Sequence, residues 1–242
     1  GTDDGNLQYS TDGGATWAPT GLNWTLSQGR AISKLEMDPL NPQVIYAATT
    51  AGLYRTTNGG TSWIVVHAGD HSDIEFEPGT SNVYVAQYDY WGSSEVYRSI
   101  DGGTTWNVLS NFGLQYNHLI LAVTPDNPAK LAVRVSDGNH PLYISTNYGS
   151  NLTYVSDLPE DAVLFISPTN ENVIYTGYMN IYASPDNGIT WNMLTYWYYN
   201  PPYEEVHADQ RNVVYNPLNP DKIYFCNDGG VYHFTESTYN WA

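Results

Sequence analysis

The chain carries S-T-D-G-G-A-T-W at residues 10–17 and repeats this octapeptide along its length. Clear copies stand at residues 56–63, 99–106 and 184–191, and weaker ones at 145–152 and 234–241. The copy at 145–152 lacks the Trp, and the last copy has Glu236 in the Asp place. A sequence element that recurs about every 40 to 50 residues indicates a repeat architecture. We therefore treat residues 1–242 as a single segment of repeats.

Each octapeptide has the composition of a tight turn between two strands. Short β-type runs precede the copies, as at Leu53-Tyr54, and follow them, as at residues 63–66. Two such runs around a polar, Gly-containing cluster predict a hairpin. The Asp or Asn accepts hydrogen bonds from its own turn, and the glycines supply positive φ angles. The Trp is expected to fold back and bury its ring.

A second repeated element contains proline and lies between the octapeptides. Its clearest form is M-D-P-L-N-P-Q-V-I-Y at residues 37–46, with related stretches at 76–84, 124–128, 167–175 and 216–224. Since proline is excluded from central strands, this element is a turn. Each full repeat then holds four strands, as in a blade of a β-propeller. The sequence predicts an all-β propeller of four-stranded antiparallel blades, five full blades plus an N-terminal half blade, within a larger propeller.

The octapeptides resemble the Asp-box, or BNR, repeat of sialidases, sortilin-like receptors, xyloglucan-active glycoside hydrolases and many secreted propellers. The stretches V-H-A-D-Q-R at 206–211 and N-D-G-G-V-Y at 227–232 are most similar to the sortilin-like and xyloglucanase-like secreted branch. The resemblance implies the propeller fold and a secreted or cell-surface location. It does not by itself imply one activity, because these families use one scaffold for unrelated functions.

The charge balance restricts the partners of the chain. The formal net charge is −17, with only 8 Lys and Arg residues among 242. Such a field repels nucleic acid and anionic membranes. The single cysteine, Cys226, excludes an intrachain disulfide and is expected to be a buried strand thiol. We expect no cofactor, no metal and no membrane insertion, and we expect further blades or domains in the same polypeptide.

The order of strands in a blade predicts which turns and loops lie at each end of the blade. The Pro turns and the octapeptide turns share one end, which we call the turn face. The other loops share the opposite end, the loop face. We therefore expect a structural, turn-capping role for the repeat carboxylates and amides: Asp12, Asn58, Asp101, Asn147 and Asp186. Function is expected on the loop face.

Aromatic residues are abundant in the predicted loops. Exposed Tyr and Trp side chains suit stacking on sugar rings or docking of an extracellular protein. The candidate ligand-binding residues are Tyr88, Tyr90, Trp91, Tyr196, Trp197, Tyr198, Tyr199, Tyr203 and His207. The alternative is that these rings pack between blades or against a neighbouring domain.

Two carboxylates, Asp209 and Asp228, are expected at one rim of one blade. We predict that they lie within about 10 Å of each other, the range in which a carboxylate pair could act on a glycosidic bond. His207 with Asp209 is a weak metal-ligand pattern, because two ligands do not make a site. The alternative is that both carboxylates cap turns, with Gly229 and Gly230 completing the second.

Several functions remain open at this point. A sialidase needs converging arginines for the substrate carboxylate, whereas Arg55 and Arg98 hold equivalent repeat positions. The first hypothesis is a secreted, non-catalytic propeller that binds a glycan or an extracellular protein. The alternative is part of a glycoside hydrolase resembling the xyloglucan-active two-propeller family, in which each propeller contributes an acidic residue. A sortilin-like peptide-binding module is a third class, although the disulfide-rich region of sortilins is absent here.

Overall fold

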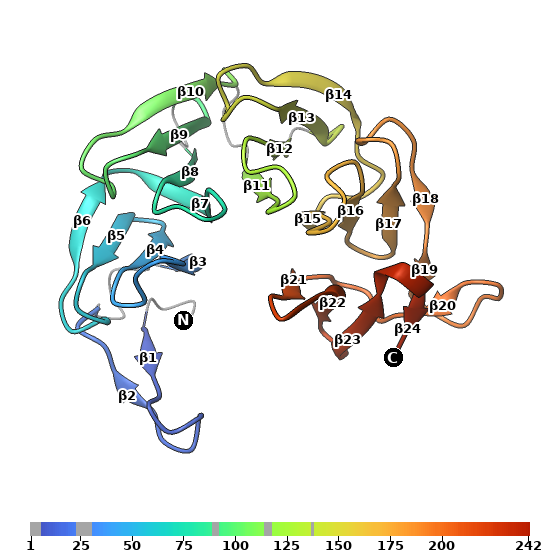
Figure 1. Cartoon of the computed structure of the whole chain (residues 1–242), viewed down its shortest axis with the longest axis horizontal. Coiled ribbons are helices and arrows are strands. Elements are labelled where there is room, and N and C mark those ends of the chain that lie inside the picture. The colour runs from blue at the N-terminus through green and yellow to red at the C-terminus, as the bar shows by residue number, and fades with distance from the viewer. Residues whose placement is uncertain (1–5, 23–30, 89–91, 114–117, 137) are drawn as a thin grey trace. The chain divides into compact units, whose positions relative to one another are not determined.

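The computed structural model describes residues 6–22, 31–88, 92–113, 118–136 and 138–242. They form two compact units, Gly1–Leu121 and Ala122–Ala242, which are treated separately below. The described residues contain five four-stranded antiparallel sheets and one 3-10 turn, η2 (Glu236–Thr238) (Figure 1). The predicted all-β class, the five full blades and the N-terminal half blade are therefore confirmed. None of the helical segments described has the length and apolar character needed to cross a membrane.

The first unit begins with the half blade and continues with two full blades. The half blade pairs β1 (Gln8–Tyr9) with β2 (Ala18–Pro19). The full blades are β3 (Ile32–Met37), β4 (Ile45–Thr49), β5 (Gly52–Thr56) and β6 (Ile64–His67), then β7 (Asp70–Phe76), β8 (Val83–Tyr88), β9 (Glu95–Ser99) and β10 (Asn107–Asn111).

The third blade begins at the division between the units, and two more follow in the second unit. Their strands are β11 (Leu119–Val123), β12 (Leu131–Val135), β13 (Pro141–Ser145) and β14 (Thr153–Asp157); β15 (Val163–Ile166), β16 (Ile174–Gly177), β17 (Ile181–Ser184) and β18 (Asn192–Met193); and β21 (Asn212–Asn216), β22 (Asn219–Asn227), β23 (Gly230–Thr235) and β24 (Asn240–Trp241). A short parallel pair, β19 (Thr195–Tyr196) and β20 (Glu204–Glu205), stands apart from these sheets.

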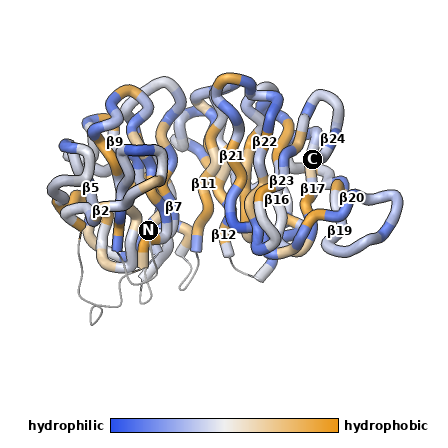
Figure 2. Tube along the Cα trace, turned by 90° about the horizontal axis from the view of Figure 1, so that it is seen from below, coloured by the Kyte–Doolittle hydropathy of each residue, from blue (hydrophilic) through white to orange (hydrophobic). Residues whose placement is uncertain are grey.

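Apolar faces of neighbouring blades form the core of each unit. In the first unit, Tyr46 and Leu53 of one blade pack against Ile74, Phe76 and Val85 of the next. In the second unit, Phe165 and Tyr175 pack against Phe225 and Phe234. In Figure 2, hydrophobic residues are concentrated along strands such as β11 and β21. Such burial of aliphatic and aromatic side chains supplies the main favourable term in folding.

A buried carboxylate ties three first strands together in the first unit. Asp73 of β7 is 4% exposed, and its Oδ1 lies 3.1 Å from Nζ of Lys34 in β3. Its Oδ2 accepts a hydrogen bond from the backbone N–H of Leu121 in β11, at 2.7 Å. A register shift between His71 and Asp73 directs the side chain inward. Asp73 thus satisfies a charge and a backbone donor on the two blades beside its own.

The octapeptide turns have the capping role that the sequence predicts. Asp12 accepts hydrogen bonds from Thr16 N at 2.9 Å and from Thr16 Oγ1 at 2.6 Å. Asp101 and Asp186 make the same pair of bonds with the residues four positions later. The hydrogen bonds from Thr16 and Thr105 lower the pKa of Asp12 and of Asp101 to about 2. Asn58 and Asn147 accept the equivalent backbone bonds from Ser62 and Asn151.

Two expectations about single side chains are wrong, and the last repeat differs from the others at Glu236. Trp17 is 62% exposed, so its ring is not buried under its hairpin, although its Nε1 donates to the carbonyl of Gly14. Cys226 lies in β22 as a strand residue, but it is only partly buried. Glu236 does not cap its own turn as the Asp residues do. Its carboxylate accepts hydrogen bonds from Ser167, Thr169 and Tyr175 of the preceding blade.

Candidate functional site

The rim predicted around Asp209 and Asp228 lies on the loop face of the second unit. Asp228 accepts a hydrogen bond from Arg211, with 3.1 Å between its Oδ1 and Nε. The Arg211 side chain is 64% exposed, and that of Asp228 is 50% exposed. Asp228, and less strongly Asp209, raises the pKa of Arg211. Both carboxylates therefore act on one guanidinium, and their separation within about 10 Å stays a prediction.

The backbone of this rim is fixed from two sides. Gln210 is 1% exposed, and its Nε2 donates to the carbonyl of His207 at 2.6 Å. Asn227 Nδ2 donates to the same carbonyl at 2.9 Å. A Cβ on Gly229 would lie 2.5 Å from Cβ of His207, so only glycine fits this approach. The imidazole of His207 thus lies against the turn between β22 and β23.

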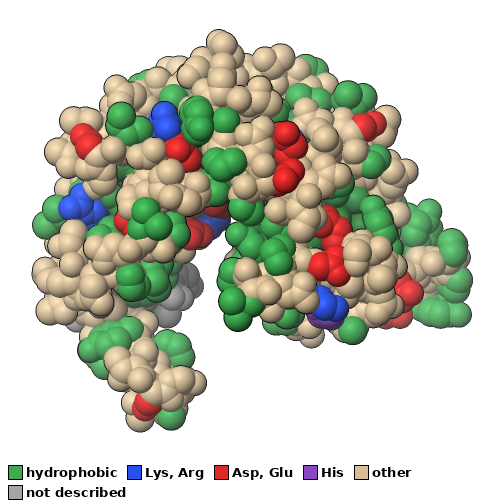
Figure 3. Space-filling model, viewed as in Figure 1, with side chains coloured by type: hydrophobic (Ala, Val, Ile, Leu, Met, Phe, Trp, Pro, Cys, Tyr) green, Lys and Arg blue, Asp and Glu red, His purple; other side chains and the backbone are tan. Residues whose placement is uncertain are grey.

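The aromatic run 196–203 precedes this rim in the sequence and forms a closed loop. The parallel pairing of β19 with β20 joins its two ends. The rings of Tyr196 and Tyr203 stack with centroids 6.3 Å apart, and Trp197 meets Tyr198 edge-on at 4.7 Å. Tyr199 is the most exposed member, at 77%. Figure 3 shows hydrophobic side chains gathered over this segment, so the expectation of exposed rings is met for most of the run.

Of the candidate ligand-binding residues in the first unit, the structure describes Tyr88 alone. Tyr88 stacks on His118 with ring centroids 4.6 Å apart. Tyr90 and Trp91 lie outside the described residues. His67 and His71 form a hydrogen-bonded pair, with 3.0 Å between Nδ1 and Nε2. Burial lowers the pKa of His71 to about 4, with a further contribution from His67.

Sequence reasoning missed three residues of the loop face. Neither Arg211 nor Tyr178 stands out in the sequence as a site residue, and Glu160 lies in an unrepeated stretch. Tyr178 is 42% exposed, and its carbonyl accepts a hydrogen bond from Gln210 N at 3.1 Å. Only their place in loops of the loop face could have drawn attention to them, since Glu160 and Arg211 precede first strands and Tyr178 lies between a second and a third strand.

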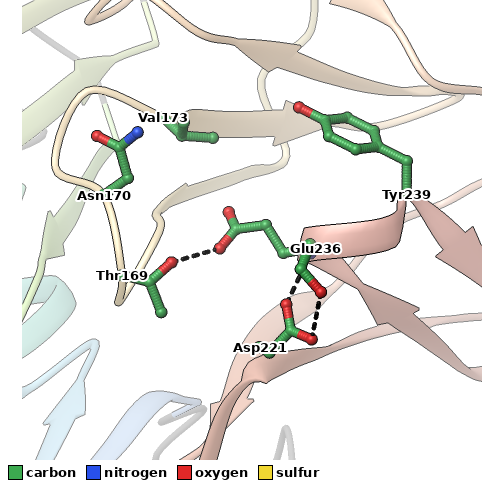
Figure 4. Close-up of a pocket in the computed structure, with 7 residues that line it drawn as sticks. Thr169, Asn170, Val173, Asp221, Glu236 and Tyr239 are labelled. Atoms are coloured by element: carbon green, nitrogen blue, oxygen red, sulfur yellow. Dashed lines mark hydrogen bonds between the residues drawn. The ribbon is translucent and has the colours of Figure 1, made fainter.

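Two other kinds of site, a metal site and a ligand pocket, have less support than the rim. Among the described residues, no group of three or more His, Cys, Asp and Glu side chains is arranged to hold a metal ion. A shallow pocket of about 170 Å³ lies on the turn face of the second unit (Figure 4). Its carboxylates are already occupied, since Glu236 binds Thr169, and Asp221 binds N and Oγ of Ser237. This pocket therefore lies where two neighbouring blades are hydrogen-bonded to each other.

The chain is similar in sequence to xyloglucanases. It is 29% identical over 163 residues to xyloglucanase Xgh74A of Acetivibrio thermocellus, a match to 64% of this chain and 17% of the relative. It is 25% identical over 252 residues to a xyloglucanase of Hypocrea jecorina, which covers 80% of this chain and 29% of the relative. The chain thus spans less than a third of the length of either relative. No protein-family model matches it.

The structural comparison supports the same fold. An ancestral GH74 enzyme matches with a TM-score of 0.72 and 21% identity, covering all of this chain and 35% of that one. Identity at this level establishes the fold alone. The sequence and structural comparisons together show that the chain is a β-propeller segment similar to part of larger xyloglucanase-type polypeptides.

Proposed function

We propose that the chain is part of a secreted glycoside hydrolase that acts on a xyloglucan-like β-glucan. This is the second of the sequence-based hypotheses, and it now takes precedence over non-catalytic binding. The observation that carries it is the 29% identity over 163 residues to xyloglucanase Xgh74A. The rim of Asp209, Arg211 and Asp228 supports it, because hydrolysis of a glycosidic bond uses acidic side chains at an accessible edge.

Asp209 is the better candidate for the acidic residue of this propeller. Asp228 accepts a hydrogen bond from Arg211, whereas no side chain in the described part of the chain donates a hydrogen bond to the Asp209 carboxylate. Asp209 has a φ of 63°, a region that few residues other than Gly, Asn and Asp occupy. Such backbone conformations concentrate at functional sites. The second carboxylate would come from another part of the polypeptide, as in the family that the sequence resembles.

Hydrolysis of soluble xyloglucan by the full-length protein tests this role. We expect Asp209→Asn to reduce kcat by about 100-fold or more, because acid–base catalysis typically contributes that much. Asn tolerates a positive φ as Asp does, so the fold is expected to persist. Asp186→Asn, on the turn face, is the matched control and should retain activity. Absence of turnover in the wild type, or an unchanged kcat in Asp209→Asn, would refute the proposal.

A non-catalytic binding module remains the second candidate, for a glycan or an extracellular protein. The exposed rings of Trp197, Tyr198 and Tyr199 favour it, since large aromatic side chains without a covering segment suit recognition. In that case xyloglucan embedded in a native gel would slow the migration of the wild type, and no reducing ends would be released. The migration of Asp209→Asn would be slowed equally.

A further inference from the structure

Glu160 links two separate aromatic segments on the loop face of the second unit. It lies between β14 and β15 and is partly buried. Its Oε2 accepts hydrogen bonds from the backbone N–H of Tyr178 at 2.6 Å and of Asn180 at 2.8 Å. Its Oε1 accepts from Nδ2 of Asn180 at 3.1 Å. The carboxylate thus holds both the main chain of residues 178–180 and the Asn180 amide.

The Asn180 amide extends this link to the aromatic run. Since its Nδ2 donates to Glu160, its Oδ1 is directed to the backbone N–H of Trp197, at 3.2 Å. Thr195 Oγ1 accepts from Ile181 N at 3.0 Å and keeps β19 beside β17. The positions of Tyr178 and Trp197 therefore depend on one carboxylate and one amide.

The rings at both ends of this link face solvent. Tyr178 is 42% exposed, and Trp197 is 44% exposed. Tyr182 lies close to the same group, since burial and the negative charge of Glu160 raise its pKa. A hydrogen-bonded network that fixes the main chain at both rings reduces the conformational entropy lost when a flat ligand stacks on them.

We propose that Glu160 and Asn180 position Tyr178 and Trp197 as a platform on which a neutral polysaccharide chain stacks. This platform rests on the proposed function for its substrate class, and it assigns Glu160 as a positioning residue. The flat apolar faces of pyranose rings fit exposed aromatic rings and require no counter-charge. A polyanionic chain would be repelled by a protein with a net charge of −17.

Affinity of the full-length protein for soluble xyloglucan, measured by calorimetry at 25 °C, tests the platform; every variant carries Asp209→Asn so that the polymer stays intact, and Asp209→Asn alone serves as the wild-type reference. We expect Trp197→Ala to weaken binding by about tenfold or more, as for a central aromatic contact. Glu160→Gln should weaken it by a smaller factor, because the amide that replaces one oxygen cannot accept the same N–H bonds. Glu171→Gln, a Glu-to-Gln change on the turn face of the same unit, is the matched control and should bind as the wild type does.

A double-mutant cycle separates positioning from general stability. If Glu160 acts through Trp197, then Glu160→Gln should cause little further loss in the Trp197→Ala background. Equal losses in both backgrounds, or a lower unfolding midpoint with unchanged affinity, would overturn the positioning role. Unchanged affinity in Trp197→Ala would overturn the platform, as would binding only to a protein partner. Loss of hydrolysis in Asp209→Asn is a separate readout, so the platform and the proposed activity can fail independently.

Discussion

The turns at Asp186 and Glu236 occupy the same place in neighbouring blades but use their carboxylates differently. Asp186 accepts N–H and O–H bonds from Thr190 of its own turn, at 2.8 and 2.6 Å. Glu236 instead accepts from Ser167, Thr169 and Tyr175 of the adjacent blade, and Asp221 binds Ser237 of the last turn. One added methylene group therefore accompanies a change from a local cap to a link between blades.

The largest expected effect comes from removing the Glu236 carboxylate, which links the two blades. Glu236→Ala would leave the buried Tyr175 hydroxyl and two further donors without their acceptor. Since hydrogen bonds to charged groups contribute about 1.5–3 kcal/mol, we expect a loss of about 3 kcal/mol in the free energy of unfolding. Urea denaturation measures it. Glu236→Gln should lose less, and equal stability of Glu236→Ala and the wild type would show that the link is energetically neutral.

Acid should weaken the local caps selectively. The carboxyl pKa of Asp101 falls from an ordinary value of 3.8 to about 2 in the folded state. A lowered carboxyl pKa adds stability that is complete above the unfolded value and is lost as the pH falls from about 3.8 to 2. The difference in unfolding midpoint between the wild type and Asp101→Asn should therefore shrink over that range. A difference that stays constant down to pH 2 would argue against a charge-dependent cap.

The smallest effect is expected from adding a carboxylate to a cap that lacks one. Asn58 accepts from Ser62 N and donates to Ser62 Oγ, at 2.9 Å in both cases. Asn58→Asp would reverse the second bond, so that Ser62 Oγ donates as Thr16 Oγ1 does to Asp12. We expect a small rise in thermal midpoint at pH 7 that disappears near pH 2. A rise that is the same at both pH values would show that charge is irrelevant to this turn.

The sequence predicted what each repeat does by itself. The spacing of the octapeptides and Pro turns predicted the blades, and the position of Asp12 and Asp101 predicted their capping bonds. Contacts between repeats were not predictable in this way. The bonds of Glu236 to Tyr175 and of Glu160 to Tyr178 join residues whose proximity depends on how strands pair and blades pack.

The same distinction, between features of one segment and contacts between segments, applies to the candidate site. The composition of residues 196–203 indicated exposed rings, and the structure confirms this exposure for Trp197 and Tyr199. The expected common rim of Asp209 and Asp228 brought the segment of Arg211 near Asp228, but the Arg211–Asp228 ion pair itself was not predicted. The role of Asp209 stays a prediction until kinetics test it.

The closed loop at residues 196–203 has a consequence for how such a protein can diversify. Its two ends are held together by the pairing of Thr195 with Glu204 and of Tyr196 with Glu205. Insertions, deletions and replacements between these anchor points leave the ladder of the neighbouring blade intact. Substitutions at this position can therefore change the outward contacts without changing the packing of the core. Related chains are expected to differ most in length and composition here.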